Sequence, residues 1–140
     1  MGRVALLALA FLIAAPCPVP PDAISRLPTR YSVLRTLHPC FLIADFDGDG
    51  IPDIALQVRE RDTGKVGIAV EHSSTKTWQI IAAGVKMSSG DDNFDWMDSW
   101  RSTINDITHR GGAILAEKSG TASGMLFWNG HEYRWQQLGN

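Results

Sequence analysis

A period of two in the apolar residues constrains the fold of this 140-residue chain more than any other feature. Apolar side chains recur at every second position in three successive segments between residues 53 and 82. They are Ile54, Leu56 and Val58, then Val66, Ile68 and Val70, then Trp78 and Ile80. Successive side chains of a β-strand point to opposite faces, so this spacing predicts half-buried strands rather than helices. Turn-forming residues separate the segments, which predicts a three-stranded antiparallel meander.

The second half of the chain has the same organisation. The further predicted strands cover residues 113–117, 124–128 and 132–136, with two earlier ones at 31–37 and 40–44. Asn129-Gly130 stands between the last two, and because both residues accept a positive φ this pair predicts a hairpin with a type I′ turn. One short helical turn can begin at Pro21. We therefore expect a single all-β domain of seven or eight strands, in antiparallel meanders, over residues 22–140.

The first residues are typical of a secretory signal. Arg3 precedes an unbroken apolar run of 12 residues, 4–15, whereas a membrane-spanning helix needs about 20. We expect residues 1–21 to be a signal peptide and a Pro-rich link, and the mature protein to be secreted or periplasmic. A lipid anchor on Cys17 is the alternative, which the preceding proline disfavours. No later segment approaches the length of a membrane span.

The two cysteines, Cys17 and Cys40, are too few for a disulfide scaffold and leave two possibilities open. If the signal is cleaved before Cys17, a disulfide to Cys40 can tether the N-terminal tail. If cleavage falls after Cys17, Cys40 is a lone thiol packed as a small apolar residue.

The balance of charge excludes some classes of partner. The chain has 13 Lys and Arg against 15 Asp and Glu, which gives a net charge of −2. It has no basic field to attract nucleic acid or an anionic membrane surface. We expect a monomer whose partner is a protein or a carbohydrate.

One segment carries chemistry, because four aspartates stand in it at relative positions 1, 3, 5 and 9: Asp45, Asp47, Asp49 and Asp53. Alternate side chains of a tight loop point inward, so the first three can converge on one ion while the fourth closes the shell. Gly48 and Gly50 permit the sharp bend, and a carbonyl near Ile51 can add a neutral oxygen. Hard oxygen ligands in a flexible loop suit Ca²⁺ better than Mg²⁺ or a transition metal. A solvated Asp/Gly turn is the alternative.

The residues after the loop distinguish this segment from an EF-hand. That motif needs a carboxylate at loop position 12 and an exiting helix, whereas position 12 is Leu56 and a strand follows. The stretch FLIADFDGDGIPDIA, residues 41–55, resembles instead an FG-GAP/VCBS-type repeat. In that family the loop binds Ca²⁺ between two strands of β-propeller-like blades.

The resemblance to FG-GAP/VCBS repeats covers about residues 41–82. It implies that Asp45, Asp47, Asp49 and Asp53 are the side-chain ligands of Ca²⁺. It also implies that the two meanders correspond to two blades, the second a degenerate unit packed on the first. The whole chain is similar to small secreted bacterial proteins that carry a single such repeat.

Residues 87–100 predict an ordered loop with two weaker signals. Asp91, Asn93 and Asp95, followed by Asp98, could hold a second ion, but Trp96 stands where a metal loop needs glycine, so we favour a solvated acidic loop. Large aromatic residues could form a platform for a sugar or a peptide, although rings at strand spacing are more often core or cross-strand pairs. These residues are Trp96, Trp100, Trp128, Tyr133 and Trp135.

The sequence defines no catalytic set. The four histidines are scattered, and no nucleophile triad, phosphate loop or paired catalytic carboxylates can be assigned. We therefore predict a non-enzymatic, secreted calcium-binding β protein that acts as a binding or interaction module. The alternatives are a small metal-dependent hydrolase that uses residues 91–98 beside the ion, and a periplasmic inhibitor or accessory protein of a larger enzyme.

Overall fold

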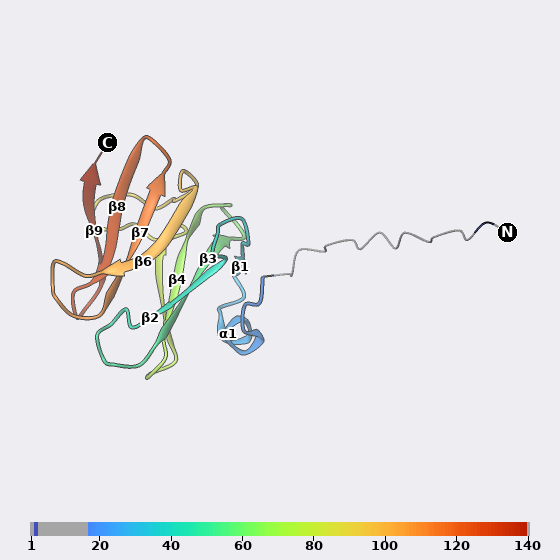
Figure 1. The fold of residues 1–140 in the computed structure, drawn as a ribbon, viewed down its shortest axis with the longest axis horizontal. Coiled ribbons are helices and arrows are strands. Elements are labelled where there is room, and N and C mark those ends of the chain that lie inside the picture. Colours follow the sequence, from blue (N-terminus) through green and yellow to red (C-terminus); the bar gives the residue numbers. More distant parts are fainter. Residues whose placement is uncertain (1, 3–16, 140) are drawn as a thin grey trace.

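A computed structural model describes residue 2 and residues 17–139, so the predicted apolar signal segment, residues 4–15, lies outside the described residues. The described part contains one short helix, α1 (Pro21–Arg26), and nine strands (Figure 1). The strands are β1 (Tyr31–Val33), β2 (Phe41–Ala44), β3 (Asp53–Glu60), β4 (Val66–His72), β5 (Thr77–Ala82), β6 (Ser99–Ile104), β7 (Gly112–Lys118), β8 (Ala122–Trp128) and β9 (Tyr133–Gly139). This arrangement confirms the predicted all-β class, both meanders and the helical turn at Pro21. Helix α1 is too short to cross a membrane, and no other helix is found in the described residues.

The strands form two antiparallel sheets. In the first sheet the order is β1-β3-β4-β5, and β2 also pairs with β3. The two short strands share one edge of β3, because β1 pairs with its last three residues and β2 with its first four. The second sheet is a simple meander in the order β6-β7-β8-β9. Strand β6 was not predicted, because only Trp100 and Ile104 of its six residues are apolar and the sequence shows too little alternation.

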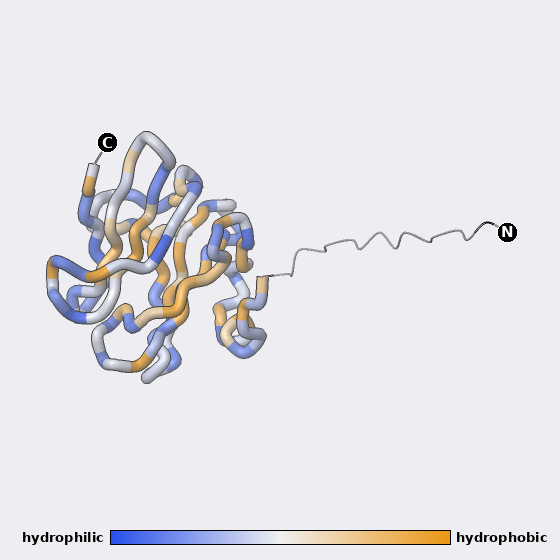
Figure 2. Tube along the Cα trace, in the orientation of Figure 1, coloured by the Kyte–Doolittle hydropathy of each residue, from blue (hydrophilic) through white to orange (hydrophobic). Residues whose placement is uncertain are grey.

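Strands β3 and β4 are buried on both faces, so the prediction that they are half-buried was wrong. The first sheet is the middle of three layers, with the second sheet on one side and α1 on the other (Figure 1). Leu56 and Val58 of β3 pack toward the α1 layer, whereas Ile68 and Val70 of β4 pack toward the second sheet. The apolar residues concentrate along these central strands (Figure 2). Alternation alone could not reveal the third layer.

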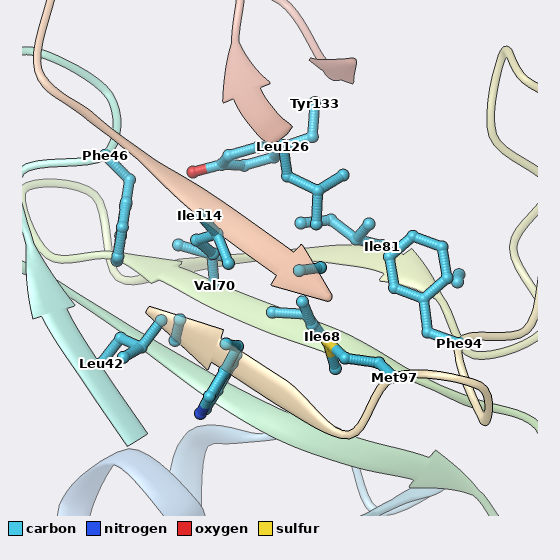
Figure 3. Packing of buried hydrophobic residues seen from close by; sticks show 14 of the residues in the cluster. Leu42, Phe46, Ile68, Val70, Ile81, Phe94, Met97, Ile114, Leu126 and Tyr133 are labelled. Atoms are coloured by element: carbon cyan, nitrogen blue, oxygen red, sulfur yellow. The ribbon is translucent and has the colours of Figure 1, made fainter. Parts of the chain in front are cut away.

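The core between the sheets is built from large side chains of both halves of the chain. Figure 3 shows Leu42, Phe46 and Val70 on one side, facing Ile114 and Leu126 of the second sheet. Phe46 and Leu126 are 1% and 0% exposed. Phe46 belongs to the acidic loop itself, so burial of its ring fixes the start of that loop against the second sheet.

The β8–β9 hairpin forms where it was predicted, but its turn is not of type I′. Trp128 pairs with Tyr133, which leaves four residues in the loop rather than two. Gly130 has a φ of 101°, whereas Asn129 is not among the residues with positive φ. The Asn129 side chain instead accepts hydrogen bonds from the backbone N–H groups of His131 and Glu132. Such capping by asparagine favours a longer turn over the two-residue one.

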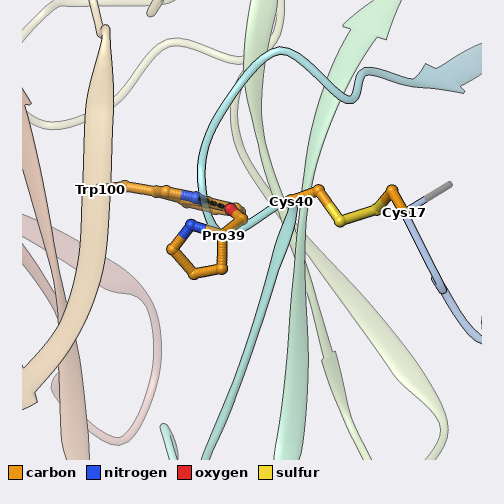
Figure 4. The surroundings of a disulfide bond; sticks show 4 residues. All are labelled: Cys17, Pro39, Cys40 and Trp100. Carbon is orange, nitrogen blue, oxygen red and sulfur yellow. Dashed lines mark hydrogen bonds between the residues drawn. A yellow bond between two sulfur atoms is a disulfide. The ribbon is translucent and has the colours of Figure 1, made fainter. Parts of the chain in front are cut away.

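Two contacts fasten the N-terminal layer to the first sheet. Cys17 and Cys40 form a disulfide with their Cα atoms 6.0 Å apart, and Trp100 donates a hydrogen bond to the neighbouring Pro39 carbonyl (Figure 4). Arg26, at the end of α1, donates two hydrogen bonds of 2.7 Å to the carboxylate of Glu71, which is 1% exposed. The disulfide resolves the choice between a bridge and a lone thiol, and it leaves no free thiol on Cys17 for a lipid.

Reduction of the Cys17–Cys40 disulfide should lower the free energy of unfolding by about 3 kcal/mol, because a closed ring of this size restricts the unfolded chain by that order. Urea unfolding with and without reductant measures the change. In the double variant Cys17→Ser, Cys40→Ser the reductant should have no effect. Equal midpoints for the oxidised and reduced wild-type protein would contradict this role.

Candidate metal centre

The acidic loop closes the hairpin between β2 and β3. Ala44, the last residue of β2, pairs with Asp53, the first residue of β3, so residues 45–52 form the whole connection. Gly48 and Gly50 have φ values of 76° and 86°, in the left-handed region where glycine is favoured. The two glycines therefore allow the bend that the sequence predicts.

The Asp45 carboxylate organises the loop from inside. One oxygen accepts hydrogen bonds from the backbone N–H groups of Gly48 and Asp49, at 2.8 and 3.1 Å, and the other accepts one from Gly50 at 2.8 Å. Asp47 and Asp49 each accept one N–H from two residues further on. The backbone thus wraps around these side chains, which holds the carboxylates in one place.

Three of the predicted ligands come together. One carboxylate oxygen from each of Asp45, Asp47 and Asp49 lies within 4.8 Å of the other two, and this is the one such group of at least three potential ligands among the described residues. Asp45 and Asp47 are half-buried, whereas Asp49 is exposed. A convergent set of carboxylate oxygens is the chemistry that a hard divalent cation requires.

Asp53 and Ile51 lie outside this group. The Asp53 side chain is 1% exposed, and its oxygens accept hydrogen bonds from the backbone N–H groups of Phe46, Asp47 and Ser73. Ile51 is 46% exposed, and its N–H donates to Asp49. Asp53 therefore clamps the loop to the β4–β5 turn, and its role as a ligand, like that of the Ile51 carbonyl, stays a prediction.

The three carboxylates are electrostatically unequal. Partial burial raises the pKa of Asp47 to about 7, and the charge of Asp53 adds to the shift. The backbone N–H of Ile51 and the side chain of Ser74 lower the pKa of Asp49 instead. A cation bound among them would relieve the unfavourable charge at Asp47, because an opposite charge stabilises the ionised form.

A buried histidine, His72, lies against the interior side of the acidic loop. His72 is 5% exposed, with Nδ1 lying 3.7 Å from the Asp47 carboxylate and Nε2 sharing a hydrogen bond of 2.9 Å with the Tyr133 hydroxyl. The Trp128 ring stands perpendicular to it, at 4.7 Å between centroids. Burial lowers the pKa of His72 and raises that of Tyr133. The neutral imidazole therefore connects the acidic loop to β9.

The turn at residues 105–112 also supports the loop, which the sequence analysis missed. Gly112 N–H donates to the Asp45 carbonyl at 2.7 Å, and a Cβ on Gly111 would lie 2.3 Å from that same oxygen. The fully buried Asn105 caps this turn, accepting from the N–H groups of Ile107 and Thr108. The adjacent glycines, Gly111 and Gly112, were the sequence feature that could have indicated this close contact. Residues 105–112 therefore hold the acidic loop in place.

Beside Asp47 the surface is hollowed. The hollow, of about 270 Å³, is lined by Thr108, Arg110 and the residues of the β8–β9 turn. It opens onto one of the three convergent carboxylates, so an ion can reach them from solvent.

The second acidic segment serves as a structural loop. Asp91 accepts hydrogen bonds from the Asn93 N–H and the Trp96 indole, and Asn93 accepts from the N–H groups of Val66 and Asp95. Asp98 accepts from Ser119 across the start of the second sheet. These contacts favour the solvated acidic loop over a second ion site.

The large aromatic residues divide between core and surface. Trp100 and Tyr133 are buried, at 3% and 8% exposure, which fits the core interpretation. Trp96, Trp128 and Trp135 are half-buried and pack against the same core. The five residues therefore do not form one platform.

Comparison with known protein families, curated proteins and solved structures found no match to this chain. Its resemblance to FG-GAP/VCBS repeats therefore rests on the acidic motif.

Replacing Gly111 by alanine should cost roughly 1–3 kcal/mol of unfolding free energy and weaken any cation binding. The new Cβ would collide with the Asp45 carbonyl, and the φ of 66° is unfavourable for a side chain. Gly120→Ala is the matched control, because its φ is 71° but nothing lies within 4 Å of its Cβ position. Urea unfolding of both variants measures the difference. Equal losses of unfolding free energy in the two variants would show that the contact with Asp45 does not contribute to stability.

The cation-free protein should lose stability relative to Asp47→Asn as the pH rises toward 7. The pKa of Asp47 is about 7 in the folded protein against an ordinary value of 3.8, so the folded state binds more protons between these values. Stability from this group is therefore greatest below the lower value and falls as the pH rises. Thermal unfolding in chelator measures the trend.

Subtracting the Asp47→Asn scans removes the opposite contribution of His72, whose lowered pKa makes stability rise with pH. Added Ca²⁺ should abolish the fall by replacing the proton on Asp47. Parallel pH profiles for the wild type and Asp47→Asn in chelator would contradict the prediction.

Proposed function

We propose that this protein is an extracytoplasmic calcium-binding β protein in which residues 45–53 hold one structural Ca²⁺. The observation that carries the proposal is the convergence of one oxygen each from Asp45, Asp47 and Asp49 within 4.8 Å. Carboxylates this close repel one another, and a cation converts that repulsion into a contribution to stability.

The donor set favours Ca²⁺ over other metals. It consists of carboxylate oxygens, with no cysteine among the three, on a loop whose sharp bend is allowed by two left-handed glycines. Ca²⁺ accepts six to eight oxygens in irregular geometry, whereas Mg²⁺ demands a near-ideal octahedron. Backbone carbonyls, water and Asp53 are the sources for the remaining ligands.

A structural role is supported by the position of the loop. It contacts three other parts of the chain, namely the β4–β5 turn through Ser73, the turn at 105–112 through Gly112, and β9 through His72. An ion at its centre would therefore stiffen the junction of both sheets. The disulfide supports a location outside the reducing cytoplasm. Calcium is plentiful in such an extracytoplasmic location.

We further propose that the chain is an FG-GAP/VCBS-type protein that binds a protein or carbohydrate partner and has no catalytic activity. The support is the motif in its β2–loop–β3 setting, together with surface hollows on a rigid two-sheet scaffold. The hydrolase alternative assigns catalysis to residues 91–98 beside the ion, but the group of convergent carboxylates among the described residues, Asp45, Asp47 and Asp49, contains none of them.

Calcium should raise the melting temperature of the mature protein relative to the same protein in chelator. At a hundredfold excess over Kd the gain is about 2.7 kcal/mol, or roughly 10 °C for a domain of this size. Differential scanning calorimetry over a calcium titration measures it, and the rise should disappear in Asp47→Ala.

The matched control is Asp95→Ala, which removes an exposed carboxylate outside the cluster and should keep the full calcium response. Metal analysis of the purified protein identifies an ion too tightly held for chelator to remove. A metal-free protein whose melting does not respond to calcium would refute the proposal. A response lost in Asp95→Ala but kept in Asp47→Ala would move the site to residues 91–98.

A further inference from the structure

A second hollow lies at the other end of the β8–β9 hairpin from the acidic loop. The loop faces the hairpin's turn, since Asp47 and Asn129 line the same hollow. The second hollow is lined instead by Ala122, the first residue of β8, and Gln137, near the end of β9. Its volume is about 270 Å³, and the ordered segment 89–96 forms its other wall. It is therefore separate from the proposed calcium site.

Three aromatic rings make up the floor and sides of this hollow. The ring centroids of Phe94, Trp96 and Trp135 lie 5.3 to 5.7 Å apart, and the two indoles are nearly perpendicular at 80°. Phe94 is 1% exposed and anchors the group in the core, whereas the two tryptophans are half-buried. Each indole N–H is bonded within the protein, to Asp91 and to Gln137. What the indoles can offer a ligand is therefore ring surface.

The position of the Trp135 ring depends on a glycine in the neighbouring strand β8. A Cβ on Gly124 would lie 1.8 Å from the Trp135 ring, so only glycine in β8 allows the indole to sit there. The facing segment is equally constrained, because the Asn93 side chain accepts the N–H of Val66 and the Asp91 side chain accepts the N–H of Asn93. Both walls are thus fixed before any ligand arrives, which reduces the cost of binding.

The polar groups of the hollow are hydrogen-bonding groups without a cation. They are the Asp91 carboxylate, the Ser89 hydroxyl and the Gln137 amide, and among the described residues no Lys, Arg or His lines the hollow. This composition disfavours an anion. Apolar ring surface beside a carboxylate, a hydroxyl and an amide matches a ligand with apolar C–H faces and a rim of hydroxyl groups.

We propose that this hollow is a binding site for one residue of a neutral saccharide, packed against the rings of Trp96 and Trp135 with its hydroxyl groups donating to Asp91. The inference rests on the binding role proposed above and names its ligand class, but it does not require the calcium ion. The two sites occupy opposite ends of the same hairpin, so each can fail without the other.

The test is a titration of the full mature protein with cellopentaose, maltopentaose and N-acetylchitotriose, followed by intrinsic tryptophan fluorescence. At least one should bind with a Kd of about 1 mM or tighter. Asp91→Asn should weaken binding by about tenfold, and Trp96→Ala should abolish it. Asp95→Asn changes a carboxylate of the same segment that does not line the hollow, and should bind as the wild type does. A melting scan confirms that each variant is folded.

Asp47→Asn separates this inference from the proposed function. Saccharide binding that persists in Asp47→Asn while the calcium response is lost supports both assignments. A normal calcium response with no binding of any of the three saccharides overturns the inference alone. Choline is added as a cationic probe, and binding of choline without binding of a saccharide also overturns it. Saccharide binding unaffected by Asp91→Asn and Trp96→Ala would place the site elsewhere and refute the assignment.

Discussion

The buried carboxylate of Asp53 is the interaction on which the arrangement around the acidic loop depends. A charge this deeply buried is tolerated only when its oxygens are satisfied by donors, and here three backbone N–H groups from two separate loops supply them. The requirement brings Phe46 and Asp47 to one side of β3 and Ser73 to the other. The acidic loop is thereby fixed at its exit, and the three remaining aspartates are left to face one another.

The middle position of the first sheet explains why the N-terminal segment is fastened twice. A sheet with apolar side chains on both faces needs a cover on each, and α1 with the residues before it supplies the second cover. A six-residue helix cannot bury enough surface to hold itself in place. The disulfide and the ion pair between Arg26 and Glu71 therefore provide the attachment to the first sheet that the small contact area of the helix cannot provide.

Sequence reasoning succeeded where a local pattern decides the structure and failed where a distant contact does. Strands β3 and β4 alternate clearly, β7 and β8 contain short apolar runs, and all four were predicted, as was the convergence of Asp45, Asp47 and Asp49. Strand β6 was missed because this edge strand has only two apolar residues, Trp100 and Ile104, among its six. Gly111 was missed as support for the acidic loop because the need for glycine comes from the Asp45 carbonyl, more than 60 residues away in the sequence.

The hydrogen bond from Gly112 to the Asp45 carbonyl bears on how far the repeat-like segment is self-contained. Residues 41–82 carry all the acidic residues of the motif, yet the backbone that supports their loop comes from the start of β7, and the ring beneath Asp47 is bonded to Tyr133 of β9. The segment is therefore not a portable unit that could be excised or grafted with its geometry intact. The shape of its acidic loop is a property of the assembled pair of sheets.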